Sequence, residues 1–212
     1  MAIPNSIKLF HILHIDKLDS ILSNSAIFSD SYIRNTGSKG TSIGMPKLKE
    51  ARLSKKLSTY PDLAVGDCTP FYFCPRSIML YMFHMGNHPE ISYHGGQEPI
   101  IHIVADFYKT IEWANSQKKR WVFTPTNATA NYTEDFNNLS MLDKIDWEVV
   151  NSNKWREKSS QKQAEFLIEQ SFPIHLIEEI GVYSEEYAKQ VSEIVLRHRV
   201  SIDVNVKRDW YY

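Results

Sequence analysis

The chain has 212 residues, with 24 Lys and Arg against 25 Asp and Glu, and its formal net charge is −1. This balance excludes a globally polycationic surface, so any nucleic-acid interface has to be local. Hydrophobic residues make up 42% and aromatic residues 12% of the chain, which is typical of a folded globule and excludes disorder by composition.

The two cysteines, Cys68 and Cys74, form neither a Cys-x-x-Cys pair nor a disulfide framework, so we expect inert core thiols. The first residues lack the charged and apolar regions of a signal peptide. No apolar run approaches the roughly 20 residues of a membrane span. The sequence therefore predicts a cytoplasmic protein with no membrane partner.

Residues 7–15 are rich in β-formers and predict a strand, after which Asp16 caps a short helix. His11 and His14 are three residues apart, so they lie on opposite faces of that strand. We expect one of them in a pocket and the other in a structural position. Further along, residues 46–57 have leucines at helical spacing and carry lysines on the opposite face, where such charges usually solvate a helix.

An aromatic run follows at residues 70–77 (PFYFCPRS). Side chains alternate across a strand, so Phe71, Tyr72 and Phe73 cannot all face one core, and at least one ring is expected to line a pocket. The alternative is a strand that is buried on both faces.

The remaining pattern alternates irregularly between strands and short helices. Helices are expected at residues 77–83 (ending near Gly86), 107–115, 133–142 and 184–198, and strands at 99–104, 121–123, 163–168, 177–183 and 200–206. This predicts a single α+β domain over residues 1–212, with a mainly antiparallel sheet.

Residues 151–160 form a long polar loop, and long loops within compact domains often carry function. Its basic and aromatic side chains could bind single-stranded DNA by phosphate contacts and base stacking; they are Lys154, Trp155, Arg156, Lys158 and the nearby Lys162. A solvated loop with Trp155 packed onto the core is the alternative. Glu165 follows on a strand, where a carboxylate needs a partner or a function.

Several chemistries are disfavoured. His84 and His88 have helical spacing, but Gly86 and Pro89 interrupt the helix and no HExxH motif exists, so no metal site is expected. Neither a G-x-S-x-G elbow nor a P-loop or G-x-G-x-x-G motif is present. A carboxylate that stabilises an oxocarbenium-like sugar, an arginine and aromatic rings would together fit displacement of nicotinamide from NAD without a metal.

Several motifs resemble, in matching order over nearly the whole chain, the DarT family of DNA ADP-ribosyltransferase toxins. They are FHILHIDKL (10–18), KEAR (49–52), PFYFCPRS (70–77), GGQEPI (95–100), IDWE (145–148), KQAEFL (162–167) and DWYY (209–212). The resemblance implies an ADP-ribosyltransferase fold, a split antiparallel β-sandwich with flanking helices around a central NAD cleft. It also implies transfer of ADP-ribose from NAD to single-stranded DNA and a macrodomain antitoxin, DarG.

Overall likeness places the chain closest to the branch that modifies thymidine, although a sister branch modifies guanosine. The resemblance makes Glu165 and Arg52 the catalytic residues, with Arg52 also placing NAD near its phosphates, and makes His11 a pocket residue on the nicotinamide side. It makes residues 71–73 (Phe71, Tyr72, Phe73) candidate walls for nicotinamide, and the loop before Glu165 the substrate-recognition loop. Ala51 departs from relatives that carry a second arginine there.

Two other classes stay open from the sequence. One is NAD hydrolysis or ADP-ribosylation of guanine, RNA or protein by the same fold. The other is a non-catalytic DNA-binding module, in which Glu165 merely pairs with a cation and is dispensable.

Overall fold

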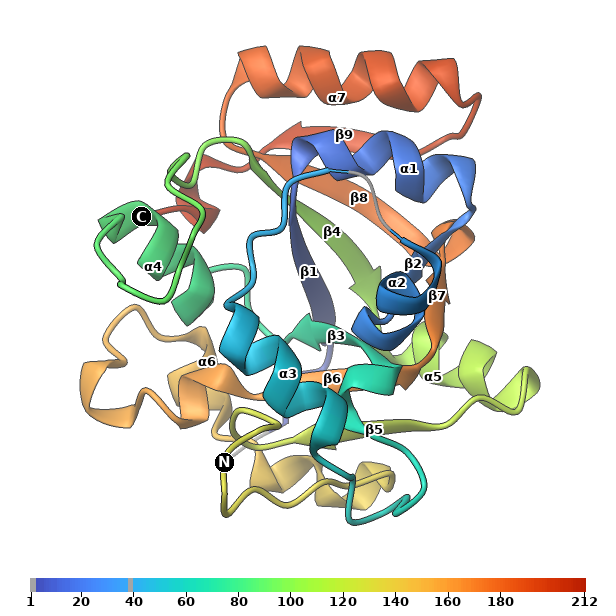
Figure 1. Cartoon of the computed structure of the whole chain (residues 1–212), viewed down its shortest axis with the longest axis vertical. Helices are drawn as coiled ribbons and strands as arrows, with labels where there is room; N and C mark the ends of the chain where they lie inside the picture. Colours follow the sequence, from blue (N-terminus) through green and yellow to red (C-terminus); the bar gives the residue numbers. More distant parts are fainter. Residues whose placement is uncertain (1–2, 38–39) are drawn as a thin grey trace.

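The computed structural model describes residues 3–37 and 40–212 and has a mixed α+β fold (Figure 1). The strands are β1 (Lys8–His14), β2 (Ala26–Phe28), β3 (Cys68–Tyr72), β4 (Ile100–Asp106), β5 (Trp121–Thr124), β6 (Glu165–Glu169), β7 (Ser171–Pro173), β8 (Ile177–Val182) and β9 (Asp203–Val206). The α-helices are α1 (Leu18–Ser23), α2 (Asp30–Thr36), α3 (Pro46–Ser54), α4 (Ile78–Met85), α5 (Phe107–Ser116), α6 (Trp147–Asn151) and α7 (Glu185–Arg197). Across the described ranges, no helix has both the length and the apolar character needed to cross a membrane.

Seven strands form one sheet in the order β5-β6-β3-β1-β4-β8-β9, and β2 and β7 form a separate two-stranded ladder. All neighbours in the large sheet are antiparallel except β8 and β9. The sheet is split in its middle. Strand β1 pairs with β4 along its whole length, but with β3 only at Phe10 and Tyr72. The predicted split, mainly antiparallel architecture with flanking helices is confirmed, and the sheet is not closed into a barrel.

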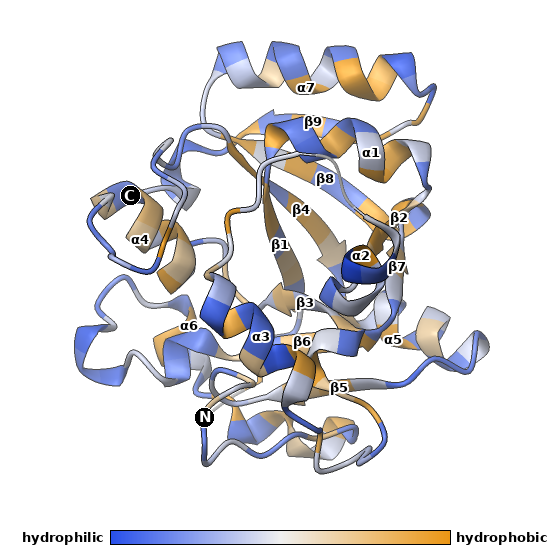
Figure 2. Cartoon of the chain, in the orientation of Figure 1, coloured by the Kyte–Doolittle hydropathy of each residue, from blue (hydrophilic) through white to orange (hydrophobic). Residues whose placement is uncertain are grey.

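The core is built around a central strand that is apolar along almost its whole length. Every residue from Ile100 to Ala105 in β4 is buried, as expected for a central strand that is covered on both faces. In Figure 2 the strands in the middle of the molecule are coloured as hydrophobic, while the outer face of α7 is mainly hydrophilic. This packing gives the split sheet the rigid walls on which a site can be built.

Helix α4 shows how local sequence sets the bounds of an element. The Ser77 side chain accepts a hydrogen bond from the Leu80 amide at 3.2 Å, which caps the first turn. Gly86 ends the helix in the left-handed conformation, with φ of 63°, that glycine adopts without strain. The predicted stop at Gly86 is therefore confirmed.

One predicted helix is wrong. Residues 133–138 are not helical, and a 3-10 helix covers only Leu139–Lys144. Phe136 instead exchanges two backbone hydrogen bonds with Phe123 of β5. The Asp135 carboxylate accepts hydrogen bonds from the amides of Ser58 and Thr59. These tertiary contacts hold the segment extended against its helical pattern.

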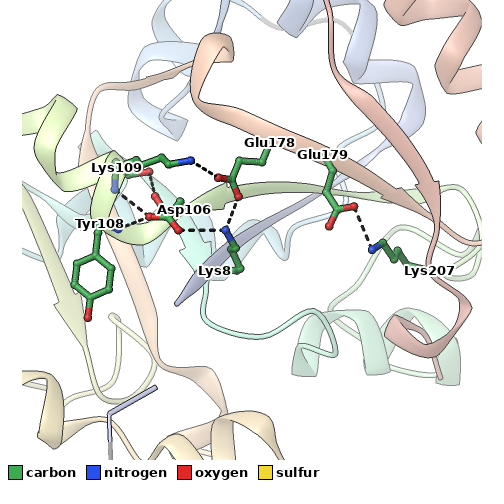
Figure 3. Close-up of polar contacts among 8 residues, drawn as sticks. Lys8, Asp106, Tyr108, Lys109, Glu178, Glu179 and Lys207 are labelled. Atoms are coloured by element: carbon green, nitrogen blue, oxygen red, sulfur yellow. Dashed lines mark hydrogen bonds and ion pairs between the residues drawn. The ribbon is translucent and has the colours of Figure 1, made fainter. Parts of the chain in front are cut away.

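Ion pairs connect strands β1, β4 and β8 at one end of the sheet (Figure 3). The Lys8 ammonium on β1 contacts Asp106 at 3.1 Å and Glu178 on β8 at 2.6 Å, and Lys109 contacts Glu178 at 2.9 Å. Asp106 also accepts hydrogen bonds from the Tyr108 and Lys109 amides and so caps α5. Half-exposed pairs of this kind are worth about 0–1 kcal/mol each, so we interpret the network as structural.

His102 should make stability depend on pH. It is fully buried on β4, with Nε2 placed 3.0 Å from the Pro75 carbonyl oxygen, and burial lowers its pKa to about 4 from the ordinary 6.5. As the pH falls, His102 binds a proton in the unfolded chain before it does so in the folded chain. The contribution of the neutral ring to the free energy of unfolding is therefore complete above about pH 6.5 and is lost as the pH falls towards about 4. In that window the free energy of unfolding should fall by about 1.4 kcal/mol per pH unit from this group.

Urea unfolding of the wild-type chain and of His102→Gln across the same pH window measures this effect. We expect a shallower pH dependence in the variant, which has no titratable group at this position. Equal slopes in the two proteins would contradict the assignment.

Candidate active site

A cavity of about 370 Å³ opens beside the split between β1 and β3. Residues of β1, α1, β2, α2, α3, β3, α4 and β6 line it, and its volume lies within the range of small-molecule pockets. The apolar part of the lining would accept flat rings. Its charged groups in the described part of the chain are Lys17 after β1, Asp30 on α2, Lys49 and Arg52 on α3, and Glu165 on β6.

The site contains a buried ion pair between Arg52 and Glu165. Arg52 Nη1 donates to Glu165 Oε2 at 2.9 Å, and the Ala128 amide donates to Oε1 at 3.0 Å. The side chains are only 8% and 3% exposed. Both carboxylate oxygens are thus held by donors, which fixes the orientation of the carboxylate on the cavity wall.

The local sequence explains how the two residues meet. Helix α3 is polar and begins with Pro46 at its first turn, and Arg52 is its one fully buried residue. Gly66 allows a close approach beside it, because a Cβ there would lie 2.9 Å from the backbone N and Cα of Leu53. Glu165 begins β6 opposite Tyr72 of β3, so register brings it to the cavity.

Arg52 retains hydrogen-bonding capacity. Within the described ranges its Nη2 is buried and has no hydrogen-bond partner. Burial acts to lower the pKa of Arg52, but the charge of Glu165 and its hydrogen bond outweigh this and raise it, so the guanidinium stays charged. A buried donor without a partner is costly, and Arg52 is one of the residues that line the cavity.

His11 also lines the cavity, whereas His14 lies outside the lining and contacts Asp16. Burial lowers the pKa of His11. Its Nδ1 lies 2.7 Å from the Pro70 carbonyl oxygen, an atom that only accepts, so Nδ1 carries the proton. The neutral ring then has Nε2 as an acceptor for a ligand hydroxyl or amide.

The aromatic strand divides between the cavity and the core. Tyr72 lines the cavity, and burial followed by the nearby charge of Glu165 raises its pKa, so the phenol stays protonated. Phe71 and Phe73 do not line it: they are 1% and 5% exposed and belong to the main core. Their expected contact with nicotinamide is corrected, because Phe71 points to the other face of β3 and Phe73 packs on Trp147.

Two members of the expected DNA loop are structural instead. Trp155 is 8% exposed and packs edge-on against Tyr81, so the alternative that placed this ring on the core is the correct one. Lys162 is 2% exposed, and its ammonium donates to the carbonyl oxygens of Val150 at 2.6 Å and Ser152 at 3.0 Å. Neither side chain is available for DNA in this arrangement.

The other loop cations are on the surface. Lys154 and Arg156 are exposed, and the exposed Lys158 contacts Asp146 at 3.3 Å. In the segments described here, no three His, Cys, Asp or Glu side chains gather as a metal site would require.

The sequence pattern missed a second aromatic wall. Phe28 and Tyr32 stack with ring centroids 4.1 Å apart and an interplanar angle of 16°, and both line the cavity. The signal that was available is the cap at Ser29, whose side chain accepts from the Tyr32 amide and starts α2. Lys17 and Lys49 line the cavity too, although the sequence pattern of residues 46–57 places Lys49 on the face expected to be solvated. Nothing in the pattern pointed to the Ala128 amide.

Comparisons with known proteins identify the class. A family profile described as "DarT: ssDNA thymidine ADP-ribosyltransferase, DarT" matches residues 10–212. A DNA ADP-ribosyl transferase of Thermus sp. (strain 2.9) is 34% identical over 99% of this chain and 98% of its own length. Among solved structures, Thermus sp. 2.9 DarT in complex with ADP-ribosylated ssDNA superposes with a TM-score of 0.89 and 33% identity, covering 100% of this chain and 99% of the other.

The same Thermus protein in complex with NAD+ superposes with a TM-score of 0.82 and 31% identity, and the match covers 100% of each chain. The fold is therefore that of a DNA ADP-ribosyltransferase. The chain belongs to the DarT family of single-stranded-DNA thymidine ADP-ribosyltransferases. The predicted family and the predicted enzyme class, an NAD-dependent transferase acting on DNA, are confirmed.

Proposed function

We propose that the cavity binds NAD and that Glu165 and Arg52 act together in transferring its ADP-ribosyl group to a thymine of single-stranded DNA. The observation that carries the proposal is the buried Arg52–Glu165 pair on the cavity wall, in which Arg52 Nη2 has no hydrogen-bond partner among the described residues. Thermus relatives in complex with NAD+ and with ADP-ribosylated ssDNA support the ligands.

In the proposed reaction, the bond between the ribose and the nicotinamide nitrogen breaks, and its electron pair leaves with neutral nicotinamide. The negative charge of Glu165 stabilises the oxocarbenium-like carbon that develops. Thymine N3 then bonds to this carbon, and Glu165 orients the imide and takes its proton. Arg52 holds the carboxylate and reaches the bound nucleotide with Nη2. Tyr72 and the stacked pair Phe28 and Tyr32 offer rings to the flat parts of NAD.

The test is to incubate the chain with labelled NAD and, separately, with single-stranded DNA, RNA and protein, and then with oligonucleotides that differ by one base. We expect label only in DNA that contains thymine, together with release of nicotinamide. Label on guanine, RNA or protein, or NAD cleavage without transfer, would contradict the proposal that thymine in single-stranded DNA is the acceptor. Oligonucleotide binding that is independent of NAD, without any transfer, would overturn the enzymatic proposal.

The DNA contacts of the 151–160 loop are proposed only for its exposed cations. Lys154→Gln and Arg156→Gln should each weaken DNA binding and reduce the salt slope, since each phosphate contact to a single strand contributes about 0.7 to that slope. Lys189→Gln on α7 is the matched control, because Lys189 is exposed on a helix outside the cavity lining. Fluorescence anisotropy of a labelled oligonucleotide over a salt series measures the slopes. Unchanged slopes in both loop variants would show that Lys154 and Arg156 do not contact the DNA phosphates.

We also propose that the chain is the toxin of a toxin–antitoxin pair and that a macrodomain antitoxin, DarG, removes its modification from DNA. Membership of the DarT family supports this proposal. A modified oligonucleotide treated with a purified DarG macrodomain should return to its unmodified mass. Persistence of the adduct would contradict the pairing.

A further inference from the structure

Two lysines on the cavity wall are not used by the Glu165–Arg52 pair. Lys17 lies in the 3-10 turn that follows β1, and Lys49 lies on α3, three residues before Arg52 and so on the same side of the helix. Both are half-buried. They come from segments that are distant in sequence, so their meeting at one cavity is a product of the fold.

The stretch between Gly40 and Gly44 packs against the stems of both lysines. A Cβ at Gly40 would lie 2.8 Å from Lys17 Cγ, and a Cβ at Gly44 would lie 2.7 Å from Lys49 Cε. The Asp16 carboxylate fixes this stretch by accepting from the Thr41 amide at 3.0 Å. Each ammonium is therefore carried on a packed stem at the cavity and does not sweep freely through solvent.

The charges of this wall are not balanced. Burial lowers the pKa of Lys17 and the charge of Lys49 lowers it further, while the carboxylates of Asp16 and Asp30 act in the opposite direction. Among the residues that the structure describes, the Lys17 ammonium forms no hydrogen bond or ion pair, and Lys49 contacts Asp30 at 3.3 Å and Ser42 at 3.1 Å. Arg52 is already paired with Glu165. Among the described residues, three cations and two carboxylates thus line the cavity, so its lining has an excess positive charge that an anionic ligand would balance.

We propose that Lys17 and Lys49 bind the diphosphate of the dinucleotide, and that Arg52 serves Glu165 and the nicotinamide ribose instead of the phosphates. This deepens the proposed function and rests on it. A diphosphate carries the negative charge that the wall lacks, and an ammonium group binds phosphate as a point charge through charge-assisted hydrogen bonds. The ligand class is then a nucleotide whose diphosphate links two riboses, as in NAD and ADP-ribose. The expected location of the phosphates shifts from Arg52 to the two lysines.

The test is calorimetric titration of the full chain with ADP-ribose, which keeps the diphosphate and lacks nicotinamide. Lys17→Gln and Lys49→Gln should each weaken binding by about tenfold, the loss expected for one charge-assisted hydrogen bond. Lys189→Gln is the control and should bind as the wild type does. The second readout is the dependence of affinity on salt, which should become weaker in both cavity variants.

Two outcomes would overturn the inference. One is unchanged affinity for ADP-ribose in both cavity variants. The other is a weaker affinity with the salt dependence of the wild type, since a lysine that only supports the fold would act in that way. A wild-type chain that binds neither ADP-ribose nor NAD would remove the proposed function itself, so the two failures are distinguishable.

Discussion

Glu165→Gln should strongly slow ADP-ribosyl transfer while the protein stays folded and continues to bind NAD. Glutamine keeps the size of the side chain, and its carbonyl oxygen still accepts from Arg52, but its amide group cannot accept from Ala128. The loss of that one hydrogen bond costs about 0.5–1.5 kcal/mol. The loss of the negative charge removes both the stabilisation of the sugar cation and the group that takes the thymine proton, so transfer should fall by about 10²–10⁴-fold.

Transfer is measured as the rate of label incorporation into a thymine-containing oligonucleotide, and NAD binding by calorimetry. The matched control is Glu193→Gln on α7, since Glu193 is exposed and lies outside both the cavity lining and the 151–160 loop. Its rate should equal that of the wild type. Full activity in Glu165→Gln would show that another group stabilises the sugar, and loss of NAD binding would assign Glu165 a role in binding instead of chemistry.

The aromatic strand shows how far sequence patterns reach. Alternation along residues 70–73 predicts that the rings divide between two faces, and the structure confirms this division. Alternation does not say which face is the cavity. That choice depends on pairing with β6, where Phe71 lies opposite Phe166 and joins the core while Tyr72 lies opposite Glu165. Register between distant strands is a tertiary property, so it was beyond a single sequence.

The lysines of the basic loop and of the site show contacts that the sequence pattern did not predict. A lysine in a polar segment predicts solvation or phosphate contact, but Lys162 is buried because two backbone carbonyl oxygens accept its hydrogen bonds. Backbone acceptors leave no trace in the sequence. Lys17 and Lys49 were missed for a related reason, since only the packing of the stretch between Gly40 and Gly44 brings their stems to one cavity. The resemblance to the family identified Arg52 and Glu165, and their contact needed the fold.

Arg52→Met should lower the free energy of unfolding by about 3–5 kcal/mol, the cost of leaving one partner of a buried ion pair without the other. The Glu165 carboxylate would stay 3% exposed with only the Ala128 amide to hold it. Replacing both charges, as in Arg52→Met with Glu165→Leu, removes the unpaired charge and should return stability to within about 1 kcal/mol of the wild type. Urea unfolding of the three proteins at neutral pH measures these differences.

The neighbouring helix offers the control. Arg34 on α2 pairs with Glu50 at 3.1 Å, but their side chains are 60% and 68% exposed, so Arg34→Met should change stability by less than about 1 kcal/mol. If Arg52→Met is as stable as Arg34→Met, water reaches the Glu165 carboxylate and the pair is not desolvated. If the double variant is as unstable as Arg52→Met alone, the loss comes from packing around α3 and not from the unpaired charge. A buried pair in which Arg52 and the Ala128 amide both hold the Glu165 carboxylate has the fixed electrostatics that transfer from a sugar cation requires.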